Sequence, residues 1–249
     1  MTSELVISRY KESLGWLKLL PQNLFDEVTV YNKGPHVDSK YAKVIERPNA
    51  GREGETYLNH IYMHYDGGLA DRVVFLQADP FEHSPDILRL LNRISDFWEV
   101  QSLSYCWQLP YRKGKLGSGM YQLGYPSFEI LPRWKDPNDN LKDLRVSTFK
   151  FVEREFSFGP SMVSKGWWPA LSVFRERWAP DSIDVYANLC GLFSADRDQI
   201  ISRNKEDYQD IRRWLLNCKM EKRSRMGRGI ILEFLWLNIL GYEDVFRRH

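Results

Sequence analysis

Residues 44–83 place two short apolar runs on either side of one helical stretch, and this pattern constrains the fold more than any other part of the chain. The runs are Val44–Glu46 and Val73–Leu76, whose β-branched side chains favour strands. Between them, residues 54–65 carry apolar side chains at i, i+3, i+4 and i+7 spacing, which predicts an amphipathic helix. A strand–helix–strand order predicts parallel strands joined by a crossover.

Other segments extend the same alternation. Strands are predicted at Leu5–Ser8, Val28–Tyr31 and Leu189–Ser194. Helices are predicted for the segment carrying Leu14, Leu17 and Leu20, for Pro85–Val100, from near Asp196, and for Tyr208–Leu216 and Gly229–Leu240. Residues 101–139 are predicted to form loops and a hairpin that lie over the sheet. The pattern of residues 144–157 fits a strand and a helix equally well. The order of elements predicts an α/β fold with a mostly parallel sheet.

Composition narrows the class of protein. The 249 residues are 43% hydrophobic, which is enough for a large core, and the net charge of +2 does not indicate nucleic-acid binding. Three widely spaced cysteines without a Cys-x-x-Cys pair indicate neither disulfides nor a zinc site. The N-terminus lacks signal-peptide features, and the most apolar stretch, Ile230–Leu240, is about half the ~20 residues that span a bilayer. We therefore expect a cytoplasmic protein without a transmembrane segment.

Asp79 follows the apolar run Val73–Leu76. A carboxylate at the end of a parallel strand can hold Mg²⁺ or Mn²⁺, because these ions prefer oxygen ligands and bridge to phosphates. Glu82 and His83 follow within one turn and can add a ligand. The alternative is that Asp79 caps a helix that begins near Pro80.

The loop Asn49–Arg52 lies between the first of these strands and the helix. Gly51 lets the backbone approach a ligand, and the N-terminus of the following helix favours anions. Arg52 can bind a phosphate through two parallel hydrogen bonds. The alternative is a plain loop whose arginine is solvated.

Arg9, Tyr10 and Lys33 follow the first two strands. A parallel sheet places them on the same edge as Asp79, where ligands bind. There Tyr10 can stack on a base, and Arg9 or Lys33 can reach a diphosphate. The alternative for each residue is a surface role.

Glu233 interrupts an otherwise apolar helix, so its pKa should be raised unless it is paired. Such an acid can accept a proton in catalysis, or it can pair with an arginine of the preceding basic loop, Lys219–Arg228. That loop can itself cover a diphosphate or be solvated. His60 and His64, spaced i, i+4 on the face predicted to lie away from the apolar stripe, are a weaker candidate metal pair.

Six blocks form an ordered set: Arg9–Leu17, Val30–Gly34, Asn49–Ile61, Phe75–His83, Gly191–Ile200 and Ile231–Trp236. Together they resemble a family of largely uncharacterised domains of microbes, fungi and large algal viruses. The resemblance runs over most of the chain and is poorest over 101–160.

That family is similar to GT-A glycosyltransferases, including a small chlorella-virus sugar transferase domain. Sugar transferases of this fold have an Asn-x-Gly turn, then an arginine near a helix start, then a strand ending in Asp-x-Asp, whose last aspartate binds the metal. Asn49–Arg52 and Asp79 follow this order, although Gln77 replaces the first aspartate. The segment Gly191–Arg197 resembles the acceptor-side strand and its following arginine.

The resemblance implies a single GT-A-like domain over 1–249, with 1–100 as the nucleotide-binding half and 101–249 as the acceptor half with the C-terminal helices. It also implies a hexosyltransferase that moves a sugar from a UDP- or GDP-sugar to a glycan or other hydroxyl acceptor, assisted by Mn²⁺ or Mg²⁺. Aromatic residues within 101–139 would cover the acceptor.

We expect Glu233 to be the catalytic base, and Asp79 and His83 to hold the metal. The residues expected to bind the donor are Arg9, Tyr10, Lys33, Asn49, Arg52 and Asp79. Two alternatives remain. One is a metal-dependent phosphodiesterase or nuclease using Asp79, Glu82 and His83, and the other is a nucleotide-sugar-binding module without turnover, which Gln77 favours.

Overall fold

The computed structural model describes most of residues 1–103 and the segment 191–217. In full, the described residues are 1–81, 83, 84, 87–97, 99–103, 191–217, 229, 232, 233, 236, 239 and 240, with the backbone of 106–108 and 120–122. The strands are β1 (Ser3–Arg9), β2 (Glu27–Asn32), β3 (Lys43–Glu46), β4 (Arg72–Gln77), β5 (Val100–Ser102), β6 (Cys106–Gln108), β7 (Met120–Gln122) and β8 (Phe193–Asp196). The helices are η1 (Gly15–Leu19), α1 (Arg52–His64), α2 (Ile87–Leu91), η2 (Ile94–Asp96), α7 (Arg197–Ile201) and α8 (Lys205–Leu216), where η marks a 3₁₀ helix.

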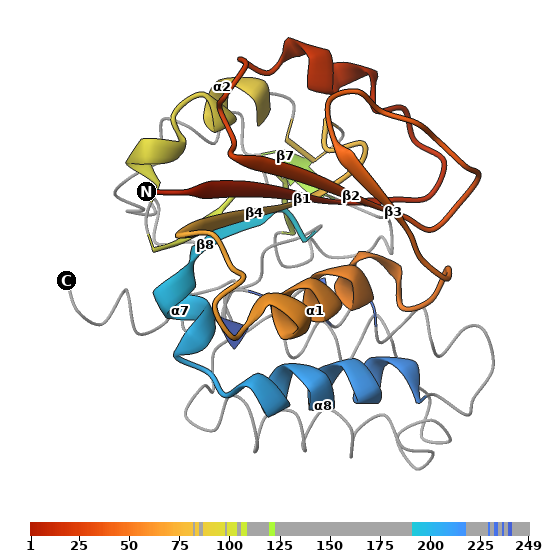
Figure 1. Cartoon of the computed structure of the whole chain (residues 1–249), viewed down its shortest axis with the longest axis vertical. Helices are drawn as coiled ribbons and strands as arrows, with labels where there is room; N and C mark the ends of the chain where they lie inside the picture. Colours follow the sequence, from red (N-terminus) through yellow and green to blue (C-terminus); the bar gives the residue numbers. More distant parts are fainter. Residues whose placement is uncertain are drawn as a thin grey trace.

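The fold is a mixed α/β domain built on a six-stranded sheet of order β3-β2-β1-β4-β8-β5. Strands β3, β2, β1 and β4 pair in parallel, whereas β8 runs antiparallel to both β4 and β5. Helix α1 lies against one face of the sheet, α8 lies beyond α1, and η1 and α2 lie on the other side (Figure 1). Strands β6 and β7 form a separate antiparallel pair.

The two central strands, β1 and β4, are covered on both faces. Leu5, Val6 and Ile7 of β1 are fully buried, as is the run Val73–Leu76 of β4. This explains why both strands are continuous apolar runs rather than alternating ones. From α1, Tyr57, Leu58 and Ile61 complete this core.

The predicted strands are confirmed, with small shifts of their ends. Leu5–Ser8 lies in β1, Val28–Tyr31 in β2, Val44–Glu46 is the end of β3, and Val73–Leu76 lies in β4. The predicted strand Leu189–Ser194 overlaps the start of β8. The predicted helix 54–65 is α1, the helix from near Asp196 is α7, and Tyr208–Leu216 lies in α8.

Two predicted helices are wrong. The segment with Leu14, Leu17 and Leu20 forms only the five-residue η1, since Trp16 is anchored there: its Nε1 donates to Ala78 O at 2.8 Å. The segment 85–100 contains α2 and η2 but ends in β5, because Val100 and its neighbours pair with β8.

Several predictions fall outside the described residues. They concern the loop Lys219–Arg228, residues 144–157 and most of 101–139, within which β6 and β7 form the one described pairing. Within the described part of the chain, the helices are too short or too polar to cross a bilayer.

Gly34 lies where the chain leaving β2 touches the chain leaving β1. A Cβ atom at this position would sit 1.6 Å from the backbone oxygen of Tyr10, so a side chain requires the backbone to move. The close approach holds together two segments that leave the same edge of the sheet.

Gly34→Ala should therefore lower the free energy of unfolding by about 3 kcal/mol, because the clash is with backbone rather than with a flexible side chain. The measurement is urea denaturation followed by circular dichroism. Gly15→Ala is the matched control, since its nearest neighbour is the Ser13 hydroxyl at 3.3 Å. Equal stability of the two variants would contradict the prediction.

Candidate functional site

A cavity of about 410 Å³ opens at the carboxyl edge of the parallel strands. The chain passes from β1 to β2 and β3 on one side and then returns to β4 on the other side of β1. A switch point of this kind leaves a crevice outside the strand ends, where α/β proteins bind ligands. The lining residues are Ser8, Arg9, Tyr10, Glu12, Lys33, Asn49, Arg52, Glu53, Gln77, Ala78, Asp79 and His83.

The cavity brings together nearly all of the predicted site residues. They come from three strand ends and from the loop before α1: Arg9, Tyr10, Lys33, Asn49, Arg52, Asp79 and His83. Glu233 is not among the lining residues, and the predicted ligand Glu82 lies outside the described residues. Glu12 and Glu53 line the cavity without having been predicted.

Asp79 presents an exposed carboxylate on a firmly held strand end. The backbone there is fixed because Ala78 N donates to Ser8 O at 3.0 Å and Ala78 O accepts from Trp16. Among the described residues, Asp79 accepts no hydrogen bond, so the alternative of a helix cap finds no support. Its oxygens are open to a ligand in the cavity.

At this end of the cavity, the carboxylate of Asp79 is of the kind that binds a hard divalent ion. Asp79 offers carboxylate oxygens and His83 lines the same cavity. Within the described part of the chain, no three His, Cys, Asp or Glu side chains form a metal-binding group. Most ligands of an ion here would therefore come from water and substrate phosphates, as is common for Mg²⁺.

Arg9 is largely committed to holding the loops around the cavity. Its Nε donates to Glu12 O at 2.8 Å, and its Nη1 donates to Asn32 Oδ1 at 2.6 Å and to Pro35 O at 3.0 Å. No hydrogen bond from Nη2 is found among the described residues. Arg9 thus organises the β1 and β2 ends and has one nitrogen left for a ligand.

Lys33 is buried and its ammonium group is fully used. Its Nζ donates to Ala50 O at 2.8 Å, Arg52 O at 2.6 Å and Glu55 Oε2 at 2.9 Å. An ammonium has three N–H donors, so none remains for a diphosphate. The structure therefore gives Lys33 a supporting role, in which it fixes the loop before α1.

Glu55 is the centre of a buried charge network. Besides Lys33, its carboxylate accepts from Arg47 Nη2 at 2.8 Å and from Arg212 Nε and Nη2 at 2.9 and 2.8 Å. Burial alone would raise the pKa of Glu55, but Lys33, Arg212 and Arg47 outweigh it and hold the pKa below its usual value. The network joins β2, the loop before α1, α1 itself and α8.

Arg52 occupies a strained position at the start of α1. Gly51 and Arg52 both have left-handed backbone, with φ of 62° and 53°, and only glycine adopts this without strain. Lys33 holds the carbonyls of Ala50 and Arg52 on either side of this turn. The residue before α1, Gly51, provides no side-chain cap, and a helix start of this kind favours an anion.

Behind Arg52 lies a pair of largely buried carboxyl groups, Glu53 and Glu233. Arg52 contacts both, with Nη1 at 3.3 Å from Glu233 Oε1 and Nε at 3.6 Å from Glu53 Oε2. Burial and the neighbouring Glu53 raise the pKa of Glu233 well above its usual value. The prediction of a raised pKa is met, and the arginine partner comes from α1.

The sequence contains a signal for Glu53, but the pattern alone does not distinguish a site residue from a solvated surface glutamate. Two glutamates, Glu53 and Glu55, lie in the first turn of α1 directly after the predicted ligand loop. Only the fold shows that Glu55 is held by three cations while Glu53 faces the cavity and Glu233.

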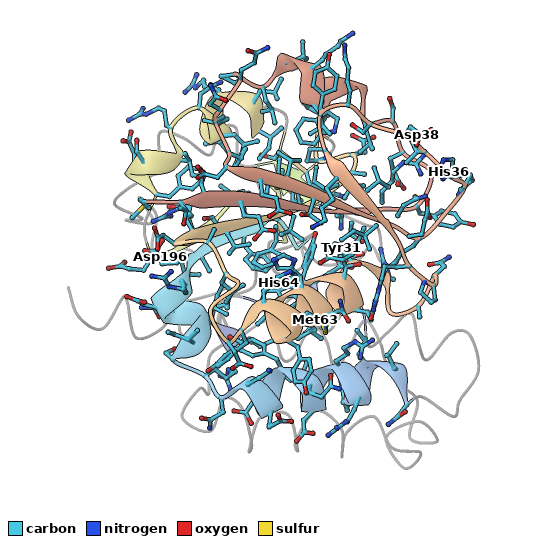
Figure 2. All side chains as sticks on the ribbon, in the orientation of Figure 1. Tyr31, His36, Asp38, Met63, His64 and Asp196 are labelled. Atoms are coloured by element: carbon cyan, nitrogen blue, oxygen red, sulfur yellow. The ribbon has the colours of Figure 1, made fainter. Side chains whose placement is uncertain are left out.

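His60 and His64 do not form a metal pair. His60 is fully buried, with Nδ1 at 2.9 Å from Tyr31 Oη and Nε2 at 3.2 Å from Glu4 Oε2, and it stacks on His64. Figure 2 shows Tyr31 and His64 between the sheet and α1. The predicted outward face was wrong for His60, because polar side chains of β1 and β2 reach across to it.

The segment Gly191–Arg197 approaches the cavity-lining residue Glu53 by its beginning rather than by its arginine. Since β8 is antiparallel, Gly191 lies beside Glu53 while Arg197 lies at the opposite edge, where Nη2 contacts Asp71 Oδ1 at 2.9 Å. Figure 2 shows Asp196 at that opposite edge, near the N-terminus.

A family model described as "Protein of unknown function (DUF3431)" matches residues 159–249. The match includes β8, α7, α8 and Glu233 but not the parallel strands that form most of the cavity wall. No curated protein and no solved structure matches the chain.

Lys33→Met should lower the free energy of unfolding by about 3 kcal/mol, because it leaves one buried Glu55 oxygen and two part-buried carbonyls without their donor. The control is Lys43→Met, whose ion pair with Glu27 is exposed and contributes little. Urea denaturation at neutral pH compares the variants. Indistinguishable losses would show that the buried network does not hold the loop.

Glu55 should also make stability depend on pH in a defined direction. The pKa of Glu55 is lower in the folded than in the unfolded protein. Its contribution to the free energy of unfolding is therefore fully present at pH values above its unfolded pKa, and it is lost as the pH falls through its folded pKa. The difference in unfolding free energy between wild type and Glu55→Gln should therefore be largest near neutral pH and shrink below about pH 4. A difference that stays constant down to pH 3 would contradict this prediction.

Proposed function

We propose that the cavity binds a nucleoside diphosphate sugar and that the protein transfers the sugar to a hydroxyl acceptor, using a GT-A-like fold. The observation that carries the proposal is the meeting of an open carboxylate, Asp79, with an accessible arginine, Arg52, and an uncapped helix start at one switch point. An arginine and a helix start favour a diphosphate, and a carboxylate favours a divalent ion bound to it.

The sheet supports a nucleotide ligand. The parallel order β3-β2-β1-β4 matches the first part of the 3-2-1-4-5-6 order of doubly wound folds, which bind nucleotides where the strand order reverses. Within the six-stranded sheet, β8 alone runs against the other strands, which agrees with the mostly parallel sheet that the proposal requires.

The diphosphate is assigned to Arg52 and the start of α1. The Arg52 side chain is 45% exposed, whereas Lys33 is buried and fully bonded. The uncapped N–H groups of α1 favour negative charge beside this arginine. Lys33 assists indirectly by holding the turn.

The base of the nucleotide is assigned to Tyr10. This side chain lines the cavity and is 48% exposed, so its ring can be covered by a stacked base. Asn49, also exposed, lies on the same wall and can hydrogen-bond to the donor.

Asp79 is proposed to hold Mn²⁺ or Mg²⁺ together with His83 and oxygens of the donor. When bound, such an ion offsets the negative charge that develops on the departing diphosphate. Gln77 lines the cavity beside Asp79 and leaves it without a second carboxylate from this motif. This favours a binding module without turnover as the second candidate, and release of nucleoside diphosphate from a donor separates the two.

Asp79→Asn should weaken Mn²⁺-dependent binding of UDP or GDP by about tenfold, since the ion loses its carboxylate ligand. Isothermal titration calorimetry with each nucleotide, in Mn²⁺ or in EDTA, measures the effect. The matched control is Asp38→Asn, because Asp38 is exposed outside the cavity, in the loop between β2 and β3 (Figure 2).

A wild-type protein that binds neither nucleotide in Mn²⁺ would overturn the proposed function. Equal affinity of wild type and Asp79→Asn in Mn²⁺ would overturn the metal role and leave nucleotide binding to Arg52 and α1.

A further inference from the structure

Glu53 lies between the cavity and Glu233. It lines the cavity although it is only 8% exposed, and Arg52 contacts both Glu53 and Glu233, which is not among the lining residues. The two come from distant parts of the chain, which meet because Gly54 has no side chain: a Cβ there would lie 2.5 Å from Leu232 Cδ2. The pair is therefore built by the packing of α1 against the segment around Glu233.

The charges around the pair allow one proton to be held between the two carboxyl groups. Two buried carboxylates in contact cannot both ionise at ordinary pH. The groups that face them are the guanidinium of Arg52, the ammonium of Lys33, which is itself neutralised by Glu55, and the neutral hydroxyl of Tyr57. Arg52 thus balances a pair that carries one negative charge.

We place the shared proton of the pair on Glu233. Burial and the neighbouring Glu53 raise the pKa of Glu233, which favours its neutral form. Its neighbour Trp236 is fully buried and apolar on most of its surface. Glu53 lines the cavity, and its buried Oε1 has no hydrogen-bond partner among the described residues, so this carboxylate has an oxygen left to accept a proton.

We propose that Glu53 accepts the proton of the acceptor hydroxyl, and that protonated Glu233 is a positioning residue that donates a hydrogen bond to Glu53. This assignment rests on the proposed sugar transfer and moves the expected base from Glu233 to the residue that lines the cavity.

In a direct displacement, the acceptor oxygen forms a bond to the anomeric carbon of the sugar. The bond from that carbon to the diphosphate oxygen breaks, and its electron pair leaves with the diphosphate. The acceptor proton moves to Glu53 and is later released to water, so the pair returns to its state with one proton.

Glu53→Gln and Glu233→Gln give opposite results under the two assignments. The probe is a panel of UDP- and GDP-sugars with Mn²⁺, with water as the acceptor and release of UDP or GDP as the readout. Glu53→Gln should reduce turnover more than about 100-fold, the usual effect of losing a general base, with unchanged UDP or GDP affinity. Glu233→Gln should remain within about tenfold of wild type, because its amide still donates to Glu53.

The pH profile separates positioning from a merely structural role. In the wild type, Glu233 loses its proton as pH rises through its raised pKa, and turnover should then fall because Glu53 is no longer held. The Glu233→Gln amide cannot ionise, so this alkaline loss should disappear. Loss of turnover in Glu233→Gln equal to that in Glu53→Gln, or a retained alkaline loss, would overturn the proposal.

A measurement without turnover keeps this inference distinct from the proposed function. In protein labelled with ¹³C at glutamate carboxyls, NMR should show one side chain still protonated at about pH 6, where ordinary glutamates are ionised. That signal should be absent in Glu233→Gln. Its absence from wild type would overturn the carboxyl pair, whereas its presence in a protein that binds UDP or GDP but never releases it from a donor would overturn the proton-acceptor role alone.

Discussion

The buried contact between Lys33 and Glu55 determines the geometry of the cavity. Each side chain is 3% exposed, so neither charge is compensated by water. The same ammonium fixes the loop carbonyls of Ala50 and Arg52, and the same carboxylate binds Arg212 of α8. One ion pair therefore sets the position of the strained turn, the direction of α1 and the docking of α8. Arg52 is left outside this network, at the cavity, because Lys33 and not Arg52 neutralises Glu55.

Much of the fold could be predicted from local pattern, because buried parallel strands are short apolar runs. The runs in β1, β2, β3 and β4 were recognised in this way, and so was the stripe of α1. The failures were segments whose conformation depends on distant contacts. The segment around Trp16 does not form the predicted helix, and the Trp16 side chain bonds to Ala78. Val100 pairs with a strand that lies more than 90 residues away in the sequence. Periodicity within one segment does not contain such information.

The candidate site could likewise be predicted in part from the sequence. The topology of a parallel sheet was enough to bring Arg9, Lys33 and Asp79 to one cavity. It could not show which of these side chains are already committed, because that depends on partners such as Asn32 and Glu55 whose geometry a pattern does not give. Glu53 was missed for the same reason.

The antiparallel strand β8 has a consequence for the order in which the molecule is assembled. Strand β5 belongs to the first half of the chain, yet its partner in the sheet is β8, which also covers the edge of β4. Until the residues beyond 190 are synthesised, β4 and β5 both lack the pairing that β8 provides. A sheet closed by such distant segments forms slowly, and its open edge attracts other strands meanwhile. On the ribosome, the first hundred residues would therefore wait for the later ones before this sheet could close.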